Sequence, residues 1–210
     1  MELSEEKKLV KLAQKDPEAF GGIFDAYHNA IYGYIVRRVG NIHDSQDITA
    51  NTFFRALTRL WQFQWRNISI ANWLYRIAGN EINQFYRRKK NPPLSLDALM
   101  DDEQYDPPSQ ENILEEMIEQ ERTLARSAEW RRIRALITQL SAPYQEVLAL
   151  RFFEGKKISE IANIMGRKEG TIKSLLSRSI KVLRTYRNQS SKTALYQQED
   201  ADRPELLASK

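Results

Sequence analysis

The chain has 210 residues, no cysteine and a formal net charge of +4. The lack of cysteine excludes a disulfide framework and a thiolate metal site, and it favours a reducing, cytoplasmic compartment. No run of about 18 apolar residues occurs and the N-terminus lacks an apolar signal core, so we expect neither membrane insertion nor secretion. The net charge is +5 over residues 1–90, −10 over 91–121 and +10 over 122–188. Two basic blocks therefore flank one acidic block, which hints at a polyanionic partner.

Apolar residues recur at helical spacing through residues 20–60 with no alternating strand pattern, so the first unit is expected to be helical. Asp44, with a carboxylate three residues later at Asp47, is predicted to cap a helix that runs to about residue 60. A further helix is expected from about 70 to 90. The loop between them, QFQWRNISI, holds aromatic and basic residues that a simple connector does not explain. It is a candidate site.

Residues 65–90 interleave aromatic, cationic and amide side chains. Aromatic rings can stack on unpaired bases, at about 1–3 kcal/mol per base, while cations hold phosphates and amides bind exposed base edges. This pattern predicts binding to single-stranded or melting DNA. Trp73 has core-like spacing and is as well explained by packing as by contact. The candidate residues are Trp65, Arg66, Asn67, Arg76, Asn80, Arg87 and Arg88.

Proline pairs bound residues 91–108, and we interpret the acidic segment 91–121 as a linker. A helix is predicted after Ser141, with Pro143 in its first turn and Gly155 as its stop. Residues 158–184 then have the form of a helix-turn-helix, with a short helix over 158–165, a turn at Gly166 and a longer helix from about Thr171.

The second helix of this motif has one apolar face and one face of cations and hydroxyls. Such side chains suit a major groove, because Arg can pair bidentately with guanine and Ser, Thr and Lys can reach bases or phosphates. A solvated basic face would explain a lone helix, but the preceding helix and turn favour duplex reading. The candidate residues are Thr171, Lys173, Ser174, Ser177, Arg178 and Lys181.

Several segments together resemble the extracytoplasmic-function (ECF) subfamily of the sigma-70 family of RNA polymerase sigma factors. They are DPEAF, DSQDITANTFFRAL, ANWLYRIAGNEINQFYRRKK and LSAPYQEVLALRFFEGKKISEIANIMGRKEGTIKSLLSRSIKVLR. The resemblance implies an all-α protein with sigma domain two over 1–90, the acidic linker over 91–121, sigma domain four over 122–188 and a polar tail over 189–210. The tail is either disordered or holds a small docking helix.

The resemblance also implies the partners: bacterial core RNA polymerase, promoter DNA with minus-thirty-five and minus-ten elements, and an anti-sigma factor. It puts Asp47, Thr49 and Phe53 on the motif that binds core polymerase. The chain departs from the family pattern at Gln46, Ala50, Asn51, Gln84 and Leu175.

The acidic linker has three open interpretations. It is a solvated tether, or, by the resemblance, it threads a basic channel of the polymerase, or it folds back on the basic units and screens DNA. The residues concerned are Asp97, Asp101, Asp102, Glu103 and Asp106.

Other classes of protein explain less of the chain. A dimeric repressor would use the same helix-turn-helix but leaves the N-terminal block unexplained. A two-metal nuclease would need the linker carboxylates as ligands, and these have no evident scaffold. An adaptor protein would not need the interleaved aromatic and basic residues. With no phosphate-binding loop or nucleophile motif, we expect no enzyme activity, catalytic residue, metal, cofactor or small-molecule substrate.

Overall fold

The computed structural model describes residues 2–90 and 135–201. Every regular element in these ranges is a helix, which confirms the all-α prediction. The N-terminal unit comprises α1 (Leu3–Ala13), η1 (Pro17–Ala19), α2 (Phe20–Val39), α3 (Ile42–Arg59), η2 (Leu60–Gln62) and α4 (Ile70–Lys90). The C-terminal unit comprises α7 (Ala142–Leu148), η4 (Ala149–Phe153), α8 (Ile158–Met165) and α9 (Glu169–Ala201). The acidic linker lies outside the described residues.

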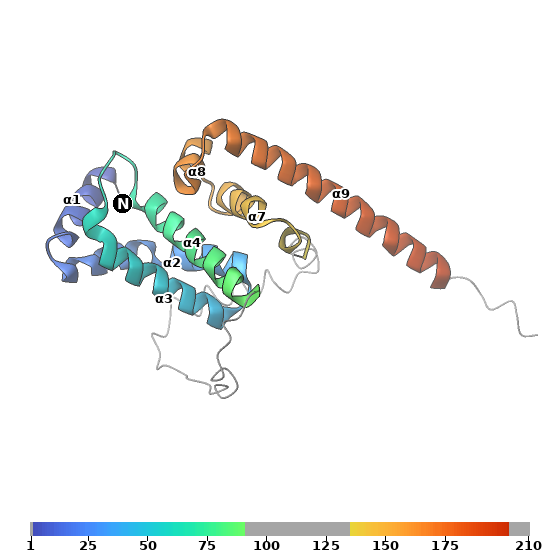
Figure 1. Cartoon of the computed structure of the whole chain (residues 1–210), viewed down its shortest axis with the longest axis horizontal. Coiled ribbons are helices and arrows are strands. Elements are labelled where there is room, and N and C mark those ends of the chain that lie inside the picture. Colours follow the sequence, from blue (N-terminus) through green and yellow to red (C-terminus); the bar gives the residue numbers. More distant parts are fainter. Residues whose placement is uncertain (1, 91–134, 202–210) are drawn as a thin grey trace, which may run out of the picture.

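In the N-terminal unit, α2, α3 and α4 pack against one another and α1 packs on α2 (Figure 1). Their apolar stripes meet in a core that includes Ile23, Ile35, Ala56, Leu74 and Ile82, none of them exposed. Most of the apolar face that the periodicity predicts for residues 20–60 is thus buried, although Phe24 and Leu57 are each 37% exposed.

The start of α3 differs from the prediction. Asn41, not Asp44, is the N-cap, and its Oδ1 accepts the Asp44 backbone N–H at 3.0 Å. Gly40, with φ of 77°, ends α2 just before it. Asn and Asp cap equally well, so the sequence alone did not decide between them. Asp44 instead lies in the first turn, where its charge suits the helix dipole.

In the C-terminal unit, α8 and α9 form the predicted helix-turn-helix. Gly166 ends α8 in the left-handed conformation, with φ of 61°, and α9 begins at Glu169. The preceding helix carries Pro143 in its first turn as predicted, but its last turns, η4, are wound as a π-helix before Gly155. Helix α9 continues past residue 188, since neither Gly nor Pro occurs between residues 171 and 203.

The two units pack directly on each other, with α8 beside α4 (Figure 1). One hydrophobic cluster runs through both units and joins Leu74 and Ala78 of α4 to Leu150, Ile161 and Ile164. The relative position of the two candidate DNA-binding regions is therefore set by apolar packing as well as by polar contacts.

Candidate nucleic-acid interface

The loop between η2 and α4, residues 63–69, contains a group of aromatic rings. The Phe63 ring lies edge-on to Trp65 with centroids 6.4 Å apart, and 5.3 Å from Trp73 of α4. Trp65 Nε1 donates a hydrogen bond to Asn67 Oδ1 at 3.3 Å. Asn67 adopts φ of 56°, a left-handed conformation that Asn tolerates better than most residues. These contacts fix Trp65 partly buried and leave Arg66 and Asn67 exposed.

A cavity of about 400 Å³ opens beside this loop. Its lining includes Phe63, Arg66, Asn72, Trp73 and Arg76. Asn72 is only 2% exposed, and neither its Oδ1 nor its Nδ2 has a hydrogen-bond partner among the described residues. A buried amide with both a free acceptor and a free donor is costly unless a bound molecule or water satisfies it. Asn72 is one of the amides that the sequence places in the stretch 65–90, but it was not among the candidate residues, because its burial beside a cavity could not be inferred from spacing.

The other predicted strand-binding residues lie along α4. Asn80, Arg87 and Arg88 are exposed. Arg76 is exposed too, but its guanidinium is engaged by the C-terminal unit: Nε donates to Ile164 O at 3.0 Å and Nη2 donates to Asn163 O. A second cavity, of about 360 Å³, lies where α4 meets α7 and α8 and is lined in part by Arg76 and Asn80.

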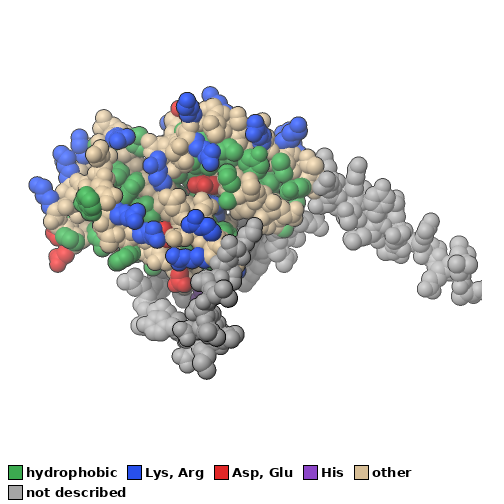
Figure 2. All heavy atoms as spheres, viewed as in Figure 1, with side chains coloured by type: hydrophobic (Ala, Val, Ile, Leu, Met, Phe, Trp, Pro, Cys, Tyr) green, Lys and Arg blue, Asp and Glu red, His purple; other side chains and the backbone are tan. Residues whose placement is uncertain are grey.

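The helix-turn-helix presents its polar face to solvent. Ile172 and Leu176 of α9 are buried against the rest of the unit. Leu175 is partly buried and packs on this core. All six predicted duplex-binding residues are exposed: Thr171, Lys173, Ser174, Ser177, Arg178 and Lys181. Figure 2 shows Lys and Arg spread over the face viewed, with few acidic side chains among them.

The predicted polymerase-binding residues of α3 do not share one surface. Asp47 is exposed. Thr49 is 3% exposed and donates to Ser45 O at 2.7 Å, while Phe53 is 4% exposed and packs edge-on against Phe24. Direct contact with a partner is therefore open to Asp47 but not to the other two in this structure.

The outer face of α3 instead presents apolar side chains that the sequence analysis missed. Phe54 is 65% exposed, Leu57 37% and Trp61, just beyond α3 in η2, 73%. They follow Asp47 at helical spacing, with Ala50 and Asn51 between. Their exposure was visible in the pattern, since Phe53, Ala56 and Leu60 already occupy the buried face.

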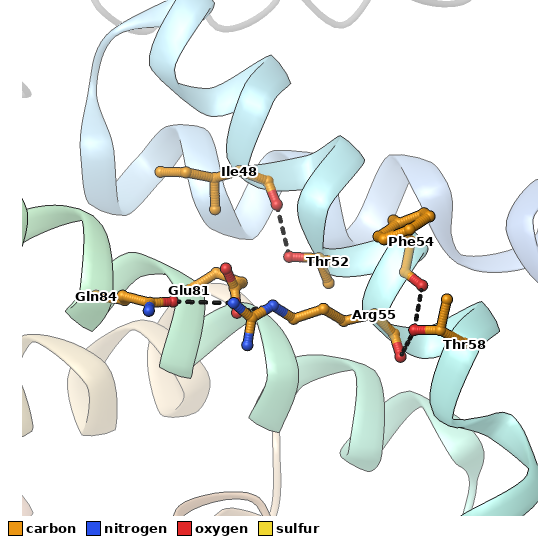
Figure 3. A network of polar contacts seen from close by, with 7 residues as sticks. All are labelled: Ile48, Thr52, Phe54, Arg55, Thr58, Glu81 and Gln84. Atoms are coloured by element: carbon orange, nitrogen blue, oxygen red, sulfur yellow. Dashed lines mark hydrogen bonds and ion pairs between the residues drawn. The ribbon is translucent and has the colours of Figure 1, made fainter.

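The inner side of α3 is tied to α4 by the network in Figure 3. Arg55 Nε lies 2.9 Å from Glu81 Oε1, and Arg55 Nη2 donates to Gln84 Oε1 at 3.2 Å. Gln84 thus takes part in joining the two helices. This network holds α3 and its exposed face against the helix that carries the strand-binding residues.

None of the helices that the structure describes is long and apolar enough to span a membrane. Residues 2–90 and 135–201 also contain no cluster of three or more potential metal-ligating His, Cys, Asp or Glu side chains.

An aromatic-basic loop on one helical unit and a solvent-facing helix-turn-helix on the other define a class of two-unit, DNA-binding transcription proteins. The family model described as sigma-70 region 2 matches residues 23–91, and that described as sigma-70 region 4 matches residues 130–183. The chain is 30% identical over 189 residues to the ECF RNA polymerase sigma factor SigW of Bacillus subtilis, covering 88% of this chain and 97% of SigW. It therefore belongs to the ECF sigma factors, regulatory subunits that act in transcription initiation and are not themselves enzymes.

Other relatives agree with this assignment. The ECF RNA polymerase sigma factor BldN of Streptomyces coelicolor is 30% identical to this chain over 178 residues. The matched region covers 84% of this chain and 63% of the length of BldN. CnrH, solved in complex with the cytosolic domain of CnrY, is similar with a TM-score of 0.61 at 19% identity, covering 88% of this chain and 97% of CnrH. The sigma factor RpoE of Bartonella quintana, solved with the anti-sigma factor NepR, gives 0.57 at 20% identity, covering 79% and 94%. These two structures support the fold.

Proposed function

We propose that this chain binds core RNA polymerase in the cytoplasm and directs it to promoters, with α9 reading the minus-thirty-five duplex and the 63–69 loop with α4 capturing the melted minus-ten strand. The observation that carries the proposal is the orientation of α9. Its apolar face is buried while the six polar residues of its other face, led by Arg178, are all exposed. A recognition helix needs this separation to enter a major groove.

The minus-ten assignment depends on the cavity beside the loop. At about 400 Å³ it falls within the range of small-ligand sites, about 300–1,000 Å³. An unpaired base entering it would meet the rings of Phe63 and Trp73. The Asn72 amide is buried in this lining, and by turning toward the cavity it could pair with both a donor and an acceptor on the base edge. Arg66, which is exposed and also lines this cavity, would hold a phosphate.

The outer face of α3 is our candidate for the polymerase-binding surface. Exposed large apolar residues next to a carboxylate are typical of the centre and rim of a protein interface. We therefore assign core contact to Asp47, Phe54 and Trp61, with Thr49 and Phe53 holding the helix in place from below. Both structural neighbours were solved with a bound partner protein, and we propose that this chain also has an anti-sigma partner.

Run-off transcription with sigma-free core polymerase, on the DNA upstream of its own gene, tests the proposal. The wild-type chain should give transcripts from one defined site. Trp65→Ala/Arg66→Ala and Arg178→Ala should each reduce them, whereas Lys8→Ala, an exposed cation on α1, should not. Absence of core binding, together with tight duplex binding by the full chain, would instead indicate a conventional DNA-binding regulator.

A further inference from the structure

Side chains of α1 hold the first end of the 63–69 loop. Gln14 is the C-cap residue of α1. Its side-chain amide contacts the backbone of η2 and of the first loop residue. Its Nε2 donates to Leu60 O at 3.0 Å and to Phe63 O at 2.8 Å. One amide group therefore links α1 to the two carbonyl groups from which the loop departs.

A second α1 side chain holds the other end. Glu6 is 1% exposed, although it lies in a helix with several solvated charges. Its Oε1 accepts from Ser69 Oγ at 2.9 Å and from the backbone N–H of Ile70. Ile70 is the first residue of α4, where N–H groups have no partner within the helix. The carboxylate thus supplies a charge-assisted bond at the positive end of the helix dipole.

Between these two attachments the loop makes few backbone contacts. Among the described residues, the backbone–backbone hydrogen bonds near it are Phe63 N to Leu60 O and Asn72 N to Ser69 O, both at its ends. The middle of the loop depends on ring packing and on the left-handed Asn67. Its position relative to the cavity is consequently fixed by what holds its ends.

We propose that Glu6 and Gln14 are positioning residues for the minus-ten loop, so that α1 sets base preference without touching DNA. The inference rests on the proposed function of the loop. Phosphate contacts supply sequence-independent affinity, whereas discrimination between bases depends on where the cavity-lining groups stand. Loss of either attachment should therefore lower base preference more than overall affinity.

The test uses the full chain with Glu6→Ala, Gln14→Ala and two matched controls. Val10→Ala weakens the packing of α1 from the same helix, since Val10 is 2% exposed and lies in the core. Glu6→Gln keeps an oxygen that can accept from Ser69 and Ile70. The readouts are amide hydrogen exchange over residues 63–70 in the free chain, and base preference in a randomised pool of single-stranded oligonucleotides at fixed salt.

Glu6→Ala should speed exchange at Ile70 by about tenfold or more, as expected on losing a bond to a charged acceptor, and should lower base preference by about fivefold. Gln14→Ala should lower base preference by a similar factor. It should also speed amide exchange, starting at Phe63 at the first end of the loop. Val10→Ala should unfold more easily and keep both loop exchange and preference. Glu6→Gln keeps an acceptor but loses the charge, so its effects should lie between those of wild type and Glu6→Ala.

If Glu6→Ala and Val10→Ala behaved alike once compared at equal stability, α1 would be a purely structural element and the inference would be wrong. A wild-type chain with no base preference at all would refute the proposed function of the loop instead. In that case exchange at Ile70 would still decide whether α1 holds the loop.

Discussion

Replacing Glu154 by alanine is expected to loosen the packing between the two units. Glu154 follows η4 in the C-terminal unit and its side chain is only 6% exposed. Its Oε1 lies 2.6 Å from Arg37 Nη2, and its Oε2 accepts a hydrogen bond from the Tyr75 hydroxyl at 2.6 Å. Both partners belong to the N-terminal unit, so this one carboxylate joins α2 and α4 to the C-terminal unit.

The size of the effect follows from these contacts. A hydrogen bond to a charged group contributes about 1.5–3 kcal/mol, and breaking a buried ion pair costs about 3–5 kcal/mol. The Arg37 side chain is 24% exposed, and water compensates part of its loss. We therefore expect Glu154→Ala to weaken unit packing by about 3 kcal/mol, and Tyr75→Phe, which removes one bond, by about 1.5–2 kcal/mol. Burial and the nearby Glu154 charge raise the pKa of Tyr75, so its hydroxyl remains a donor.

The chain has no cysteine, so cysteines introduced at two chosen positions are the only sites that a thiol-reactive fluorophore labels. Cysteines placed at Thr58 and Arg184, both exposed, can carry a fluorophore pair that reports the separation of the units. Glu154→Ala should broaden and lengthen the distance distribution, with Tyr75→Phe intermediate. Glu169→Ala removes an exposed carboxylate of the same unit and should leave the distribution unchanged.

Unchanged distances in both Glu154→Ala and Tyr75→Phe would refute this reasoning. The apolar contact of α4 with α8 would then be sufficient to hold the units, and the short polar contacts of Glu154 would add nothing measurable to it.

Three further predictions concern stability and polymerase binding. Gly166→Ala should lower the free energy of unfolding by about 1–2 kcal/mol in urea titrations, because φ of 61° is unfavourable for any residue with a Cβ. Burial raises the pKa of Tyr34 from 10.0 to about 12. The folded chain therefore keeps a proton that the unfolded chain releases, and the free energy of unfolding should fall between pH 10 and 12, by about 2–3 kcal/mol from this group. Tyr34→Phe should flatten that fall, and equal slopes would contradict the assignment. Phe54→Ala and Trp61→Ala should lower affinity for core polymerase by about tenfold or more in pull-down titrations while leaving the melting temperature unchanged. Wild-type affinity in both variants would exclude this face of α3 as the contact.

The sequence was sufficient to predict those parts of the fold and candidate site that depend on a short, regular pattern of residues. The helix-turn-helix could be predicted because Gly166 and the apolar spacing of Ile172 and Leu176 are local signals. The same periodicity correctly placed Arg178 and its neighbours on the exposed face. Their roles in reading DNA stay a prediction.

The sequence was insufficient to predict contacts in which a side chain binds a residue far along the chain. Glu6 resembles the solvated charges around it, and only the fold brings it to Ser69, 63 residues away. Thr49 and Phe53 were taken from a family motif, which mixes residues that face a partner with residues that support them. Burial separates these two classes, and it depends on how α3 lies against α2 and α4.

Arg76 shows the same limit and also links the two units to DNA binding. Its guanidinium donates to Asn163 O and Ile164 O at the C-terminal end of α8, where the carbonyl groups carry partial negative charge. A guanidinium has five N–H donors, and those of Nε and Nη2 that donate to α8 cannot donate to a phosphate at the same time. The packing of α8 on α4 therefore weakens strand capture by Arg76. If the strand binds fully only when the units are apart, its apparent affinity is multiplied by the fraction of molecules in that state, a loss of about tenfold for each 1.4 kcal/mol of packing. Weakening the Glu154 contacts should therefore strengthen binding of the minus-ten strand, even though Glu154 lies in the unit that we assign to the other promoter element.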